Sequence, residues 1–308
     1  MNQKIERILA NVQKPGRYVG GELNAVIKDK ADVDVRFAFC FPDVYEVGMS
    51  HLGMKILYSV LNEQPDIWCE RVFAPWVDME EEMRKHDIPL FALESGDSVA
   101  EFDFIGFTLQ YELSYTNILN MLNLAGIPIR AQDRTDLFHI VVAGGPCACN
   151  PEPLADFVDL FFIGEGEQVD LEVIRLYQAC KKEGKSKEEF LQKAAQIQGV
   201  YVPSLYSVTY HDDGTIKEMI PHAAAPKTVR KRLELDMDKA YFPEKFVVPS
   251  IEIVHDRAVA EVQRGCIRGC RFCQAGFIYR PVREKSVDMI NRQCRSICEH
   301  TGYDEISL

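Results

Sequence analysis

The 308-residue sequence lacks several features that define whole classes of protein. It contains no run of about 18 apolar residues, so no transmembrane helix and no membrane partner are expected. The first residues carry no apolar segment of the signal-peptide type, so a secretory signal is not expected either. Internal repeats and low-complexity tracts are absent, and 47% hydrophobic with 27% charged residues is the composition of an ordinary globular protein.

An excess of positive charge is also missing, because 35 Lys and Arg residues stand against 47 Asp and Glu residues, a formal net charge of -12. This balance does not favour binding of nucleic acid by the whole protein, although a local basic patch is compatible with it. Ten cysteines without a secretory signal favour reduced thiols over a disulfide framework. We therefore expect a cytoplasmic protein whose cysteines are packed thiols or metal ligands.

Apolar runs that alternate with helical patterns predict an α/β fold. Strands that are apolar throughout and are each followed by a helix indicate a parallel sheet covered on both faces. We assign residues 1–195 to such a domain, a Rossmann-like doubly wound sheet with an N-terminal extension. The expected strands are residues 33–41, 88–93, 102–109, 139–143 and 158–163, and the expected helices are residues 48–62, 115–125 and a stretch that ends near residue 182.

The pattern changes after this domain. Residues 196–250 contain Asp212-Asp213-Gly214 between two alternating runs, which predicts a β-hairpin within a proline-containing connector. Residues 251–308 then begin a second α/β unit with a strand at 257–262, a loop, a helix at 286–300 and the start of another strand. One and a half βα units cannot bury a core, so we expect this sequence to be the N-terminal part of a longer protein.

The loop of the second unit contains three cysteines within eight residues, Cys266, Cys270 and Cys273. Thiolates this close together, directly after a strand, can converge on one metal centre, and three of them leave one iron of a 4Fe–4S cluster open. A structural zinc site prefers four closed ligands, and no fourth ligand stands at the usual spacing, so a zinc-stabilised interaction protein is the weaker interpretation. Arginines that could offset the negative charge of a cluster surround the loop: Arg264, Arg268, Arg271, Arg280 and Arg283.

This Cys-x3-Cys-x-aromatic-Cys loop, with Phe272 as the aromatic residue, resembles the defining motif of the radical S-adenosylmethionine (SAM) superfamily. The resemblance implies that Cys266, Cys270 and Cys273 bind three irons of a 4Fe–4S cluster, that SAM binds the fourth iron, and that Phe272 lies beside the adenine. It implies an enzyme that reductively cleaves SAM to a 5′-deoxyadenosyl radical, on a (βα) barrel whose start is residues 251–308. Flavodoxin or ferredoxin would be the electron donor, and the substrate class, RNA or protein included, stays open. We expect residues 1–308 alone to turn over slowly or not at all.

Loops at the ends of the first and later strands resemble those of the cobalamin-binding domains that precede some radical SAM barrels. Residues 43–48 match an Asp-x-His-x-x-Gly loop in placement, with a tyrosine in the position of the histidine, and Gly-Gly-Pro and Gly-Glu-Gly-Glu turns follow later strands. The resemblance implies a corrinoid as a further candidate cofactor, with methyl or alkyl transfer as the reaction. The implied cofactor-binding residues are Asp43, Tyr45, Gly48, Gly144 and Gly145.

Several alternatives stay open at this stage. A phenol replaces imidazole poorly, so cobalt ligation by Tyr45 is not expected, and His51 is the nearest other candidate. Glu165 and Glu167 could instead serve to cap the following helix, since carboxylates are favourable at a helix N-terminus. Residues 14–24, 42–52 and 262–266 are similar to an uncharacterised bacterial group of cobalamin-binding-type radical SAM proteins. The competing functional class is non-enzymatic, a corrinoid- or redox-sensing module with a structural Fe–S cluster.

Overall fold

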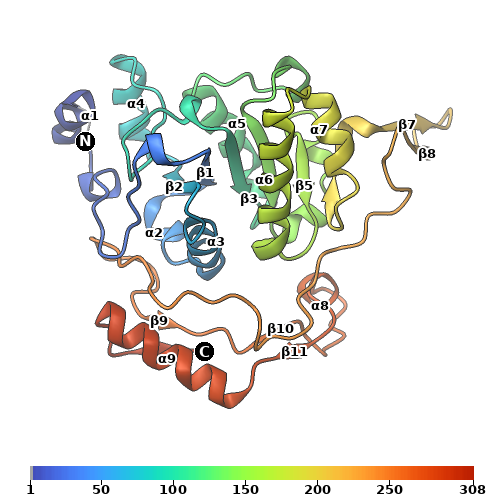
Figure 1. Cartoon of the computed structure of the whole chain (residues 1–308). Coiled ribbons are helices and arrows are strands. Elements are labelled where there is room, and N and C mark those ends of the chain that lie inside the picture. Colours follow the sequence, from blue (N-terminus) through green and yellow to red (C-terminus); the bar gives the residue numbers. More distant parts are fainter. Residues whose placement is uncertain (1–2) are drawn as a thin grey trace.

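The computed structural model describes residues 3–308 and is organised around a six-stranded, mostly parallel sheet (Figure 1). The strand order is β2-β1-β3-β4-β5-β6. The first five strands of this order run parallel, whereas β6 pairs antiparallel with β5 at one edge. The strands are β1 (Val35–Phe41), β2 (Ile67–Phe73), β3 (Phe104–Thr108), β4 (Ile140–Gly144), β5 (Leu160–Phe162) and β6 (Val200–Tyr201).

Helices cover both faces of this sheet and bury one apolar cluster on each. Side chains alternate along β1, so that Phe37 and Phe39 enter one cluster while Ala38 and Cys40 enter the other. The first cluster packs against α3 (Leu52–Asn62), α6 (Gly166–Lys182) and α7 (Lys187–Ala194). The second packs against α1 (Gln3–Ile8), α4 (Val77–Lys85) and α5 (Tyr115–Leu124). The short helix α2 (Tyr45–Gly48) follows β1.

The remainder of the chain forms a hairpin and a separate C-terminal unit. The predicted hairpin is present as β7 (Tyr206–Tyr210) and β8 (Ile216–Pro221), which project from the side of the sheet domain in Figure 1. In the C-terminal unit, drawn in orange and red, β9 (Ala258–Val259) and β12 (Ile306–Ser307) pair in parallel around α9 (Val287–Thr301), as the βα pattern predicted. Between them, β10 (Gln263–Arg264) pairs antiparallel with β11 (Arg283–Glu284), and α8 (Ala275–Ile278) lies in the enclosed loop. No helix within residues 3–308 has the length and apolar character needed to cross a bilayer.

Two details of the predicted sheet are wrong. Residues 88–93 are buried except for Pro89 but form no strand, because Pro89 lacks an N–H and the neighbouring amides bond to scattered partners, for example Leu90 N–H to the Leu124 carbonyl at 3.0 Å. The strand beside β1 is instead β2, which sequence reasoning missed because Glu70 and Arg71 interrupt its apolar pattern. Both side chains are nevertheless buried, which requires ionic partners.

Arg71 provides the most deeply buried of these ion pairs. Its guanidinium, on a side chain only 2% exposed, lies 2.8 Å from Glu22 Oε2 and 2.6 Å from Glu94 Oε1. Burial by itself would raise the pKa of Glu22, but the charge of Arg71 lowers it below its ordinary value. The group joins the N-terminal extension to β2, so the extension is held to the sheet by a desolvated charge network.

We predict that Arg71→Leu lowers the free energy of unfolding by about 3–5 kcal/mol, because the substitution leaves two buried carboxylates without a cation. Urea denaturation followed by circular dichroism measures the change. The matched control is Arg84→Leu, which removes an exposed i,i+4 pair with Glu80 and should cost less than about 1 kcal/mol. Equal losses for the two variants would contradict a special role for the buried network.

Candidate functional site

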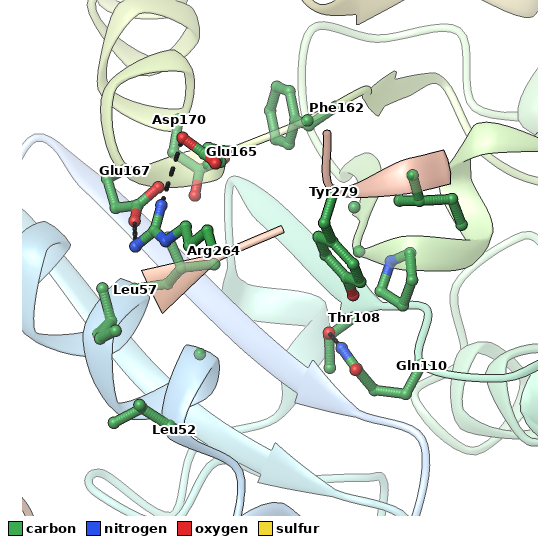
Figure 2. A pocket seen from close by; sticks show the side chains of 18 of the residues that line it. Leu52, Leu57, Thr108, Gln110, Phe162, Glu165, Glu167, Asp170, Arg264 and Tyr279 are labelled. Atoms are coloured by element: carbon green, nitrogen blue, oxygen red, sulfur yellow. Dashed lines mark hydrogen bonds and ion pairs between the residues drawn. The ribbon is translucent and has the colours of Figure 1, made fainter. Parts of the chain in front are cut away.

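The main cavity of the molecule, about 430 Å³ in volume, opens at the carboxyl edge of the parallel strands. In the order β2-β1-β3, the chain changes direction between β1 and β3, and ligands of open α/β sheets bind at such a switch point. The C-terminal unit closes the cavity from the other side with Arg264, Gly265 and Tyr279. The cavity is therefore bounded by both parts of the chain (Figure 2).

Most of the cavity wall is apolar, and its polar groups are concentrated in small clusters. Phe37 and Phe39 of β1, Phe162 of β5 and Leu57 of α3 form apolar wall. One polar cluster comes from the start of α3 and the end of β3: His51, Thr108 and Gln110. Another lies at the start of α6 and includes Glu165, Glu167 and Asp170.

His51 occupies the N-cap position of α3, where its Nδ1 accepts a hydrogen bond from the Met54 amide at 3.1 Å. Burial lowers the pKa of His51, which favours the neutral ring. Because Nδ1 is the acceptor, the proton of that neutral ring resides on Nε2. His51 in this arrangement has no free nitrogen lone pair to give to a metal.

The second polar cluster is a network of ion pairs between the sheet domain and the C-terminal unit. Arg264 of β10 lies 2.6 Å from Glu167 Oε1 and 3.3 Å from Glu165 Oε2, the pairs marked by dashed lines in Figure 2. Arg264 also bonds Glu261 at 2.8 Å, and Arg283 of β11 lies 2.6 Å from Glu165 Oε1. Burial opposes charge on Arg264, but the carboxylates around it raise its pKa. Lys285 lies 3.3 Å from Glu261. We call these six residues the Glu–Arg network: Glu165, Glu167, Glu261, Arg264, Arg283 and Lys285.

The Glu–Arg network changes two of the expectations from sequence. Glu165 is the N-cap residue of α6 but makes no capping hydrogen bond with its side chain, so the capping interpretation is wrong for that residue. Arg264 and Arg283 are bound to carboxylates and do not face the cysteine loop as free cations. Sequence reasoning could have paired the Gly-Glu-Gly-Glu turn with these arginines only by knowing that the start of α6 lies against the β10–β11 pair.

The cysteine loop is the segment that the β10–β11 pair closes at its base. Gly265 precedes the first cysteine with a φ of +97°, and a Cβ there would lie 2.6 Å from the Pro281 carbonyl oxygen, so the loop entrance requires glycine. Cys266 and Cys273 are half-buried, whereas Cys270 is exposed and Phe272 is 92% exposed. The loop begins and ends at the cavity, since Gly265 and Ile278 both line it.

The donor set of this loop fits an Fe–S cluster by its chemistry. Cys266, Cys270 and Cys273 are free thiols on one exposed loop, and nothing lies within 4 Å of a Cβ built on Gly269 between them, so the loop has room around it. Within residues 3–308, no group of three His, Cys, Asp or Glu side chains is arranged so that it could hold a metal ion. Cluster binding by these cysteines therefore stays a prediction.

The residues predicted to contact a corrinoid are placed in two groups. Gly144 and Gly145 line the cavity, whereas Asp43, Tyr45 and Gly48 are not among its lining residues. Tyr45 is 1% exposed, and its hydroxyl donates to Glu22 at 2.9 Å. Asp43 accepts hydrogen bonds from the Val44 amide and the Tyr111 hydroxyl, and Gly48 leaves space for the Phe73 ring.

Asp170 is a cavity residue that sequence reasoning missed. It lies on α6 beside Val169, Val173 and Ile174, the buried face of that helix. A charged residue type at a buried position of an amphipathic helix is the signal that could have identified it. Burial, with a contribution from Glu167, raises the pKa of Asp170 well above its ordinary value, which favours the protonated carboxyl.

Comparison with known proteins gives three findings. Residues 53–203 match a family model described as radical SAM proteins, N-terminal. The chain is 28% identical over 255 residues to an uncharacterised protein of Methanocaldococcus jannaschii, a match that covers 82% of this chain and 43% of that protein. Among solved structures it is similar to TsrM from Kitasatospora setae, a radical S-adenosylmethionine methyltransferase, with a TM-score of 0.49 and 12% identity over 89% of this chain and 47% of that one. The chain spans less than half the length of each of these two proteins.

We predict that Glu165→Gln lowers the free energy of unfolding by about 2 kcal/mol, because one partner of two partly buried arginines loses its charge. Amide hydrogen exchange in residues 258–285 should accelerate, since the base of the cysteine loop loses its attachment to α6. Glu172→Gln is the control, because Glu172 lies on the same helix and pairs with Arg232 at the surface, where the loss should stay under about 1 kcal/mol. Unchanged exchange in residues 258–285 of Glu165→Gln would show that the network does not hold the loop.

Proposed function

We propose, on the match of residues 53–203 to the N-terminal model of radical SAM proteins, that the chain is the cofactor-binding part of an enzyme that reductively cleaves SAM at a 4Fe–4S cluster. The cysteine loop carries the proposal. Its base is fixed at the mouth of the main cavity by the Glu–Arg network, and its three thiols are free. A loop with this donor set beside a cavity of about 430 Å³ joins a metal-binding segment to space for an organic ligand.

Each part of the site has a role in this proposal. Cys266, Cys270 and Cys273 would hold three irons, and the bound cluster with SAM would supply one-electron cleavage of a carbon–sulfur bond. Phe272 would lie beside the adenine. Exposure of Cys270 and Phe272 leaves the loop accessible to an electron donor of the flavodoxin or ferredoxin type.

A corrinoid is the further cofactor that we propose for the cavity. The cavity wall is apolar along β1, β4 and β5, where it includes Phe37, Val142 and Phe162, and Gly144 and Gly145 lie at its edge, which suits the planar aromatic base of a cobalamin tail. A bound corrinoid would supply methyl or alkyl transfer.

The residues near the cavity fit the corrinoid tail but not axial ligation of cobalt. The Tyr45 hydroxyl is buried against Glu22, and burial with the charge of Glu22 raises the pKa of Tyr45, so a phenolate ligand is disfavoured. The Nδ1 of His51 is occupied by the Met54 amide, which puts the proton on Nε2. We therefore infer a cobalt without a protein imidazole ligand.

Replacement of Cys266, Cys270 or Cys273 by Ala should reduce iron and sulfide to background after anaerobic reconstitution of the 308-residue chain. Three thiolates are already one fewer than the four irons of the cluster, so each loss exposes a second iron. Elemental analysis and electron paramagnetic resonance of the reduced protein measure the result.

The control for these variants is Cys294→Ala, which removes a half-buried thiol on α9 and should leave the iron content unchanged. A full cluster in Cys270→Ala would show that Cys270 is not a ligand. Zinc without sulfide in the unmodified chain would favour the zinc-stabilised interpretation instead.

The cobalt prediction is tested on the Co(II) form of a corrinoid bound to the chain. Its electron paramagnetic resonance spectrum should lack nitrogen splitting from the protein, and His51→Gln should leave that spectrum unchanged. A single-nitrogen splitting that disappears in His51→Gln would contradict the inferred tautomer. Failure of the unmodified chain to bind any corrinoid would remove the corrinoid from the proposal and leave the cluster in place.

A further inference from the structure

Asp170 is a polar side chain without a partner on the wall of the main cavity. The residue is 4% exposed, on the second turn of α6, and it lines the cavity. Within residues 3–308, its carboxyl makes no hydrogen bond or ion pair, unlike the three carboxylates of the Glu–Arg network nearby. Figure 2 places it beside Glu165, Glu167 and Arg264.

The space around this carboxyl is kept open by a glycine. A Cβ built on Gly166 would lie 3.2 Å from Asp170 Oδ2 and 3.1 Å from Leu57 Cδ2, which is tighter than ordinary contacts. Any larger residue at position 166 would press on both side chains. The first turn of α6 is thus shaped so that the carboxyl and the apolar Leu57 face the same cavity.

The nearby positive charges are not available to Asp170. Arg264, Arg283 and Lys285 all lie against the carboxylates of Glu165, Glu167 and Glu261. These three cations and three anions sum to zero, so an ionised Asp170 would add an uncompensated charge next to Glu167. A neutral carboxylic acid, which has one O–H donor and one carbonyl acceptor, avoids that cost but still leaves two hydrogen-bonding groups unsatisfied.

Taking the cavity as the ligand site of the proposed function, we propose that Asp170 is its polar recognition group and binds an uncharged amide of the ligand through paired hydrogen bonds. A primary amide or a lactam presents one N–H and one C=O side by side, the complement of a neutral acid. A cationic ligand would have to bring a second charge out of water and ionise Asp170 beside Glu167, which is the costlier arrangement. An anionic ligand would meet Glu167, and Lys231, the lining cation outside the Glu–Arg network, already donates to the Ile278 and Arg280 carbonyls.

Three small probes that share one ring and differ only in the polar group separate these chemistries: benzamide, benzylamine as its ammonium ion, and benzoate. Their dissociation constants for the 308-residue chain are measured by ligand-observed NMR at pH 7, without cluster or corrinoid. Benzamide should bind at least about tenfold more tightly than either charged probe, which corresponds to the loss of a hydrogen-bonded pair in a desolvated site.

Two isosteric variants then assign the effect to Asp170. Asp170→Asn keeps a donor and an acceptor and should bind benzamide within about threefold of the unmodified chain, whereas Asp170→Leu should bind it at least about tenfold more weakly. Removal of an unpartnered buried acid should leave Asp170→Leu at least as stable as the unmodified chain, so a loss of binding would not reflect unfolding.

The results that would overturn the proposal are specific. Benzamide binding that is absent, or that is equal in Asp170→Leu, would show that Asp170 recognises no amide. Tighter binding of benzylammonium that is lost in Asp170→Asn would show that Asp170 acts as an anion. These measurements need no cluster, so the two proposals can fail separately. Amide selectivity in a chain that builds no cluster would overturn the proposed function alone. A cluster in a chain without amide selectivity would overturn the role of Asp170 alone.

Discussion

The ion pairs of Glu165 and Glu167 with Arg264 and Arg283 are the constraint on which the site depends. The glutamates begin α6 at the carboxyl edge of the sheet, and the arginines lie in β10 and β11, the two strands that close the cysteine loop. Charges that are largely removed from water are stable only in a narrow geometry, because each must keep its partner. The network therefore fixes both the wall of the cavity and the position from which Cys266 extends.

Strand order determines what this network can enclose. Because β1 lies between β2 and β3, the loops after β1 and β3 lead away from each other and open a space at the sheet edge. The loops after β4 and β5 end at the same edge, so Gly144, Gly145 and the start of α6 share one cavity with His51. The C-terminal unit does not create this space but covers it with Arg264, Gly265 and Tyr279.

Sequence patterns predicted the parallel sheet and the hairpin, because these depend on local apolar runs and turn residues that act over a few positions. The patterns missed β2 and misassigned residues 88–93, since the burial of Glu70 and Arg71 is decided by distant partners and Pro89 prevents regular pairing. Within the candidate site, the cysteine motif was readable because its three thiols are close in sequence. The partner of Glu167 could not be predicted, because Arg264 is about 100 positions away in the sequence. The open space beside Asp170 could not be predicted either, because it depends on the close approach of Gly166.

The arginine-rich segment around the cysteines divides into two sets with different chemistry. Arg264 and Arg283 are neutralised by the glutamates of α6, whereas Arg268, Arg271 and Arg280 are exposed and form no ion pair in the part of the chain that the structure describes. A ligand in the cavity therefore meets a polar cluster without net charge, and an anionic group bound at the cysteine loop meets three free cations. One segment of about 20 residues thus separates a site that selects by hydrogen bonding from a site that favours negative charge.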